Sequence, residues 1–80
     1  MKKDRYSSLH QYIHNNLRKA REKAGMRQVD IAMRLNQPQS YVSKYESGER
    51  ILDVIELKQV CDALGMSLTE FVSQIEEEIS

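Results

Sequence analysis

Five polar side chains share one predicted helix face: Gln39, Ser40, Ser43, Lys44 and Ser47. They follow one another at offsets of one, three and four residues, which places side chains on the same face of a helix. Their tips are amide, hydroxyl and ammonium groups, and none is a carboxylate. Such a face suits the pattern of hydrogen-bond donors and acceptors in the DNA major groove, which is wide enough for one helix.

The first turn of this helix would enter the groove first. Gln39 can make two hydrogen bonds to adenine, at N6 and N7. Ser40 and Ser43 can bond bases or phosphates, and Lys44 can reach guanine or the DNA backbone. We therefore expect these four residues to read bases.

Further residues could hold the DNA backbone. Gln28 begins the preceding predicted helix, where the helix dipole favours a bound phosphate. Arg27, Arg34 and Arg50 would add electrostatic attraction to the backbone.

Two short helices joined by a tight turn must position these groups, over about residues 28–35 and 38–47. Asn36 tolerates the left-handed backbone that such a turn requires, and Pro38 suits the first position of a helix. Neither helix is long enough to be stable alone, so the rest of the domain must hold both. Their predicted inward residues are Ile31, Ala32, Leu35, Val42 and Tyr45.

Three further helices are predicted, over about residues 8–24, 53–64 and 67–79. The pairs Ser8 with Gln11, Asp53 with Glu56, and Ser67 with Glu70 have the spacing of capping boxes. The predicted inward stripes are Leu9, Ile13, Leu17, Ala20 and Ala24, then Val54, Leu57, Val60, Cys61 and Leu64, then Leu68, Phe71, Val72, Ile75 and Ile79. No stretch alternates as a strand would, so we expect one all-α domain over residues 1–80.

The charge of the chain is strongly polarised although its net charge is zero. Residues 1–50 carry eleven of the twelve Lys and Arg and five of the twelve acids, or +6, and residues 51–80 carry −6. The field at a surface depends on local charge, so a basic half that contains the two-helix motif is compatible with a nucleic-acid partner. The alternative is an ordinary basic helix beside a solvated acidic tail.

Other functional classes find little support in the sequence. The lone Cys61 permits no intrachain disulfide and is expected in the core. His10 and His14 are four residues apart, which can suit zinc, but without further ligands nearby we expect surface histidines. No arrangement of residues predicts an enzyme or a cofactor, and no apolar run predicts a signal peptide or membrane span, so a cytoplasmic protein is expected.

The segment from Leu17 to Phe71 resembles the lambda-repressor-like, Cro/XRE-type helix-turn-helix family: LRKAREKAGMRQVDIAMRLNQPQSYVSKYESGERILDVIELKQVCDALGMSLTEF. The resemblance implies a compact five-helix DNA-binding domain, with the helix-turn-helix at about residues 28–47 and a C-terminal helix at about residues 68–79. By position it implies an ion pair between Arg21 and Glu46. It also implies base-reading roles for Gln39, Ser40, Ser43 and Lys44, a phosphate contact from Gln28 and a position along the backbone for Tyr41. The residues expected to contact the DNA backbone are therefore Gln28, Arg27, Tyr41, Ser47 and Arg50.

The sequence departs from this family at two positions. Arg27 stands where Ser or Thr often caps the second helix, and Asn36 replaces the usual turn glycine. Neither change threatens the fold, although the second helix could begin less firmly or gain a phosphate contact.

The expected function is sequence-specific binding of double-stranded operator DNA by a transcriptional regulator, as a repressor and homodimer. The alternative is an antitoxin or a protein-interaction adaptor that uses the same fold to bind a partner protein. For the dimer, Ile75 and Ile79 are one candidate surface, and the alternative is that the last turn frays or folds back on the first helix.

Overall fold

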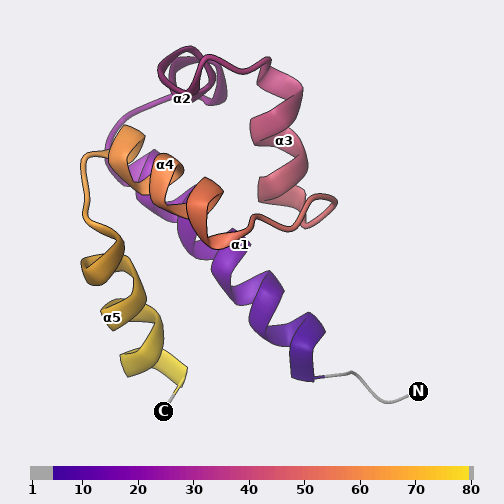
Figure 1. The fold of residues 1–80 in the computed structure, drawn as a ribbon, viewed down its shortest axis with the longest axis vertical. Coiled ribbons are helices and arrows are strands. Elements are labelled where there is room, and N and C mark those ends of the chain that lie inside the picture. Colours follow the sequence, from indigo (N-terminus) through magenta and orange to yellow (C-terminus); the bar gives the residue numbers. More distant parts are fainter. Residues whose placement is uncertain (1–4, 80) are drawn as a thin grey trace.

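The computed structural model describes residues 5–79, and side chains from Leu9 to Glu78. It contains five helices and no strand within that range (Figure 1). The helices are α1 (Arg5–Lys23), α2 (Gln28–Leu35), α3 (Gln39–Ser47), α4 (Val54–Leu64) and α5 (Leu68–Ile79). The all-α prediction and the five-helix order are confirmed.

Two of the three predicted capping boxes form. At α4, the Glu56 amide donates to the Asp53 carboxylate at 2.8 Å and the Asp53 amide donates to the Glu56 carboxylate at 3.0 Å. At α5, Glu70 and Ser67 exchange the same two bonds at 3.0 and 2.9 Å. Each box satisfies two amides that the helix itself leaves without a partner.

The predicted start of the first helix is wrong. α1 begins at Arg5, three residues before Ser8, and ends at Lys23 rather than Ala24. No Pro or Gly precedes Ser8 to stop the helix, so the backbone continues through it. Pro38 lies just outside α3, as its cap residue, rather than at its first helical position.

The core draws on every helix. The largest fully buried side chains are Tyr45, Phe71, Leu17, Ile31, Val42, Val60 and Cys61. Ile75 also belongs to this core, and the Tyr12 hydroxyl of α1 donates a hydrogen bond to Glu78 of α5. Ile75 is therefore not exposed as a dimer surface, and α5 contacts the first helix near its own C-terminal end, through Glu78. The Ile79 side chain lies outside the described residues.

The first turn of α4 contradicts the predicted inward stripe. Val54 was expected inside, yet it is 64% exposed, as is Ile55, and Ile51 just before the helix is 50% exposed. Val72, Leu9 and Ala24, also predicted inward, are exposed. The stripe of α4 becomes buried only from its second turn onward, at Val60 and Cys61, because the first turn lies beyond the covered core.

Among the described residues, no helix combines the length and apolar character needed to cross a membrane.

Candidate nucleic-acid interface

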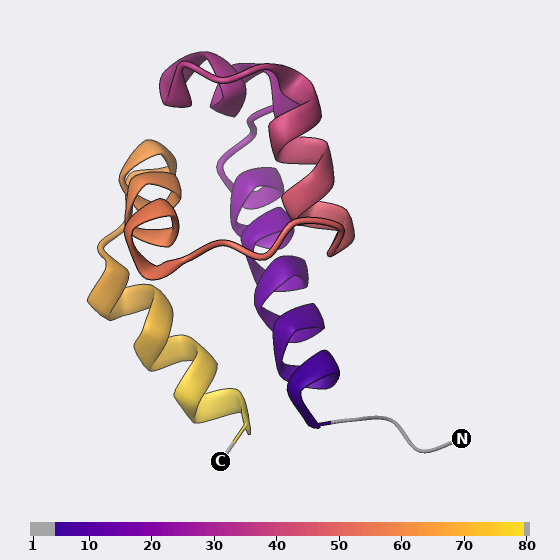
Figure 2. The ribbon, with the colours of Figure 1, turned by 45° about the vertical axis from the view of Figure 1, so that its right-hand side comes forward.

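The turn between α2 and α3 is closed by its own backbone. Asn36 adopts the left-handed conformation, with φ 56° and ψ 43°, as the sequence predicted. The Gln37 amide then donates to the Ala32 carbonyl at 3.0 Å, and the Asn36 amide donates to the Met33 carbonyl at 3.1 Å. These bonds set the angle between α2 and α3, which lie together at one end of the molecule (Figure 2).

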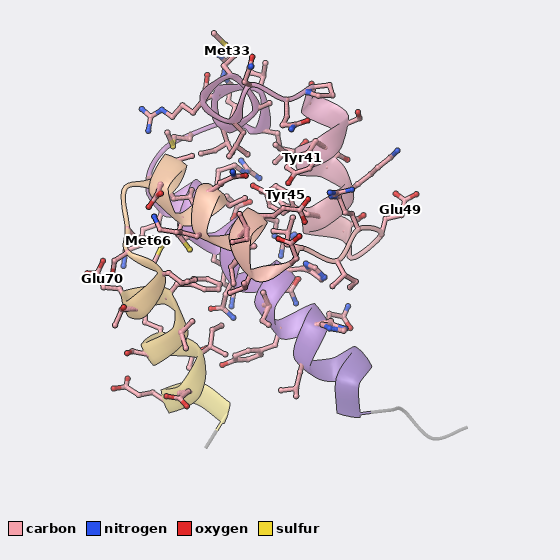
Figure 3. All side chains as sticks on the ribbon, viewed as in Figure 1. Met33, Tyr41, Tyr45, Glu49, Met66 and Glu70 are labelled. Atoms are coloured by element: carbon pink, nitrogen blue, oxygen red, sulfur yellow. The ribbon has the colours of Figure 1, made fainter. Side chains whose placement is uncertain are left out.

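α3 is fixed on one side and exposed on the other. Val42 and Tyr45 are fully buried, and Tyr45 points from α3 toward the centre of the molecule (Figure 3). The Tyr41 ring packs edge-on against Tyr45, with ring centroids 5.7 Å apart. Burial of this face holds a helix of nine residues that would not be stable in isolation.

The opposite face of α3 presents the predicted base-reading residues. Gln39, Ser40, Ser43 and Lys44 are all exposed. Among the residues that the structure describes, Ser40, Ser43 and Lys44 make no side-chain hydrogen bond or ion pair within the protein. Their donors and acceptors are thus available to an external ligand.

A chain of polar contacts connects the core to this face. Arg21 donates to the two carboxylate oxygens of Glu46 at 2.7 and 3.0 Å, and to the Met26 carbonyl at 2.8 Å. The Gln28 amide donates from Nε2 to Glu46 Oε1 at 3.0 Å, and Gln39 donates from Nε2 to Gln28 Oε1 at 3.2 Å. The implied ion pair between Arg21 and Glu46 is present, and it raises the pKa of the Arg21 guanidinium.

The Arg27 side chain is largely committed at the start of α2. Its guanidinium donates to both carboxylate oxygens of Asp30, at 2.9 and 3.1 Å, and its backbone amide donates to the same group at 2.8 Å. The guanidinium bond, followed by the backbone bond, lowers the pKa of Asp30 to about 2. Asp30 thereby accepts from the backbone amide of the residue before α2, which is the part of a capping box that the third helical residue supplies. The amide that a capping Ser or Thr would accept from, that of Asp30, donates instead to the Arg27 carbonyl at 3.0 Å.

The other candidate backbone residues also have partners inside the protein. Arg50 pairs with Glu56, and its guanidinium carbon lies 4.9 Å from the centre of the Tyr41 ring. Arg34 donates to the Ala63 carbonyl at 2.9 Å, which ties α2 to α4. The Ser47 hydroxyl donates to the Lys44 carbonyl at 3.0 Å, so its proton is used at the end of α3.

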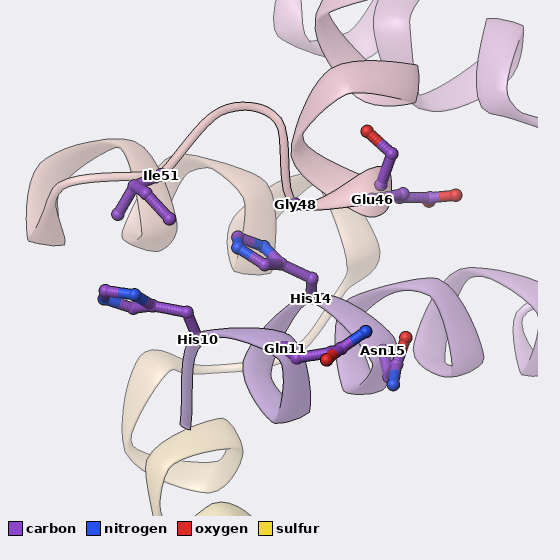
Figure 4. Close-up of a pocket in the computed structure, with 8 residues that line it drawn as sticks. His10, Gln11, His14, Asn15, Glu46, Gly48 and Ile51 are labelled. Carbon is purple, nitrogen blue, oxygen red and sulfur yellow. The ribbon is translucent and has the colours of Figure 1, made fainter. Parts of the chain in front are cut away.

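A small cavity adjoins the C-terminal end of α3 (Figure 4). Its volume is about 280 Å³, and its lining includes His10, His14, Glu46 and Gly48. His14 is only 3% exposed, so the expectation of surface histidines is wrong there. The sequence signal was its position three residues before Leu17, on the inward face of α1. No group of three or more metal-ligating residues is found in the described part of the chain.

His14 is expected to make stability depend on pH. Both ring nitrogens are buried without a hydrogen-bond partner, and burial, then the nearby His10, lowers the His14 pKa below its usual 6.5. The unfolded chain therefore takes up a proton first as pH falls, so folding stability decreases below about pH 6.5. His14→Leu should raise the Tm by several degrees near pH 7 and weaken this acid dependence, because an unpaired buried polar group costs about 1–3 kcal/mol.

Thermal unfolding of both proteins at about pH 7.5 and about pH 5 measures this effect. Equal changes of Tm with pH in the parent protein and in His14→Leu would contradict the assignment to His14.

The model of one protein family, described as helix-turn-helix, matches residues 17–71. The control protein C.MunI of a Mycoplasma species is 34% identical over 65 residues, covering 80% of this chain and 88% of that protein. An XRE-family-like protein from Pseudomonas syringae pv. tomato has a solved structure that matches at TM-score 0.87 and 37% identity, covering 94% of this chain and 92% of that one. A mutant of the restriction-modification controller protein C.Esp1396I, bound to its highest affinity operator site, matches at TM-score 0.78 and 27% identity, covering 89% and 92%.

Proposed function

This chain belongs to the Cro/XRE-type, lambda-repressor-like helix-turn-helix family, and we propose that it regulates transcription by placing α3 in the major groove of an operator. It is a sequence-specific DNA-binding regulator with double-stranded DNA as its partner. We propose that it represses transcription and that residues 1–80 act as one domain. We also propose that it is not an enzyme and that it works in the cytoplasm, where its DNA lies.

The observation that carries this proposal is the two-sided character of α3. Val42 and Tyr45 are sealed in the core while the polar face points outward without an acidic side chain among its four candidate readers. A merely solvated face needs no such rigid mounting. Direct base readout does, because hydrogen bonds to base edges tolerate little error in position.

The proposed contacts with DNA follow from the hydrogen-bond donors and acceptors that are not used inside the protein. Gln39, Ser40, Ser43 and Lys44 read base edges. Gln28 keeps one N–H for a phosphate, since it has two and gives one to Glu46. The other residues proposed to contact the DNA backbone are Arg27, Tyr41, Ser47 and Arg50. Some of them must share or exchange their present partners within the protein when DNA binds.

We propose a homodimer that forms through the first turn of α4. Ile51, Val54 and Ile55 form an exposed apolar group close together in sequence, whereas Ile75 is buried and unavailable. This burial also weakens the alternative of an antitoxin or adaptor that docks a partner protein through its last helix. A two-fold dimer of this family type would read half-sites roughly 34 Å apart.

A selection of preferred duplexes from a random pool, followed by gel shift, tests the function. The parent protein should enrich one two-fold symmetric site, and Gln39→Ala should relax the base preference at one position per half-site by about 1–3 kcal/mol. Lys58→Gln, which changes an exposed lysine of α4 paired with Asp62, is the control and should leave the selected site unchanged. Enrichment of no motif would refute the proposal.

A further inference from the structure

The Glu46 carboxylate begins a hydrogen-bonded chain that ends at the exposed tip of Gln39. The Glu46 side chain is only 4% exposed and bonds Arg21 and Gln28. A carboxylate paired with a guanidinium offers acceptors alone. Gln28 must therefore turn its amino group toward Glu46, which leaves its carbonyl oxygen to face Gln39.

The same reasoning fixes the amide of Gln39. Since the carbonyl oxygen of Gln28 can only accept, Gln39 gives it one of its two N–H groups. The oxygen and the other N–H of Gln39 remain available, and their side chain is exposed. If the neighbouring group could both donate and accept, either orientation of the glutamine amide would form a hydrogen bond with it equally well.

The two orientations match different bases. In the major groove adenine offers one donor at N6 and one acceptor at N7, whereas guanine offers two acceptors, O6 and N7. The free oxygen and N–H of Gln39 complement adenine. In the reversed orientation Gln39 would present only its amino group, which complements guanine.

We propose that Glu46 is a specificity-determining positioning residue, which makes Gln39 select adenine over guanine by fixing the orientation of two successive amides. The inference rests on the proposed function, in which Gln39 reads a base edge. Glu46 itself touches no DNA: it acts from inside the protein, through Gln28. The phosphate contact of Gln28 is a separate role, served by its second N–H.

Glu46→Gln tests the proposal, because an amide at position 46 can either donate or accept, so the chain can then run in both directions. Binding is measured on duplex pairs that differ only by A or G at the base pair identified with Gln39→Ala. The parent protein should prefer A by roughly 5- to 100-fold, the range expected of a good bidentate contact. Glu46→Gln should bind the two duplexes within about 2-fold of each other while keeping its preferences at the other positions.

A second variant guards against loss of the fold. Gln28→Leu removes the middle link and leaves the Arg21–Glu46 pair intact, so it should relax the same A-over-G preference even where Glu46→Gln is too unstable to measure. Its lost phosphate contact lowers affinity for both duplexes alike and cancels in their ratio. The matched control, Asp62→Asn, makes the same carboxylate-to-amide change at an exposed position of α4 and should keep the parent ratio.

The outcomes separate this proposal from the proposed function. An A-over-G ratio that survives in both Glu46→Gln and Gln28→Leu, but is lost in Gln39→Ala, would overturn the role of Glu46 and leave the function standing. Preferences relaxed equally at every position would show a purely structural role and also overturn it. A parent protein with no base preference anywhere would refute the proposed function, and this inference with it.

Discussion

Ile55→Asp is expected to sediment as a monomer and to bind a duplex with two half-sites at least 100-fold more weakly than the parent protein. Ile55 is 64% exposed at the first turn of α4, beside the exposed Ile51 and Val54. In a two-fold apolar contact, the introduced carboxylate would be buried close to the same carboxylate of the second protomer, without a cation to pair with. The free-energy penalty of burying these charges is far larger than the free energy that the apolar contact contributes. Two linked reading domains gain roughly 10²–10⁴ in affinity over one, and a monomer forfeits this gain.

Met33→Asp is the matched control for the oligomeric state. Met33 is 75% exposed on α2, at the outer edge of the molecule (Figure 3), so the same change of charge occurs on another face. It should leave the sedimentation coefficient unchanged. A parent protein that is already monomeric at tens of micromolar, or an Ile55→Asp variant that remains dimeric, would show that this surface does not join two copies.

Glu46→Leu is expected to lower the free energy of unfolding by about 3 kcal/mol, a large part of the stability of a domain of this size. The change leaves the Arg21 guanidinium without its carboxylate partner. Because only 12% of the Arg21 side chain is exposed, water cannot fully replace that partner. Removing one partner of a buried ion pair typically costs about 3–5 kcal/mol, and the remaining exposure of Arg21 places this pair near the lower limit. Urea unfolding followed by circular dichroism measures the loss.

The double variant Arg21→Met with Glu46→Leu separates charge burial from packing. It removes both ions and keeps apolar volume, so it should recover most of the lost stability. Since Arg21 also donates to the Met26 carbonyl, a small deficit should remain. If the double variant were no more stable than Glu46→Leu, the loss would lie in packing rather than in an unpaired guanidinium.

The sequence predicted the elements whose signals are local. Asn36 tolerates a left-handed turn, Asp53 and Ser67 have capping partners three residues on, and the structure shows all three features. The exposed polar face of α3 was also predictable, because Val42 and Tyr45 define its opposite side.

Features that depend on three-dimensional packing were not predictable in the same way. Val54 fits the helical period of α4, yet it is 64% exposed, because the buried core of the described residues meets α4 at Val60 and Cys61, further along the helix. His14 is polar and was placed at the surface, but α3 and the following loop close over it. The contact from Gln28 to Glu46 joins residues 18 apart, and only the crossing of α2 with α3 brings them together.

On the polar face of α3, the Gln39 side chain is hydrogen-bonded to the rest of the protein, whereas three neighbouring side chains make no such bond to the residues that the structure describes. This difference has a consequence for how such a regulator can evolve. Gln39 is joined through Gln28 to the buried pair of Arg21 and Glu46, so mutations that change its proposed target base through that chain are also expected to lower the stability of the fold. Ser40, Ser43 and Lys44 are exposed and can be exchanged at little thermodynamic cost. Relatives that bind new operators should therefore differ first at these three positions. The base that we propose Gln39 contacts should be the same in their operators.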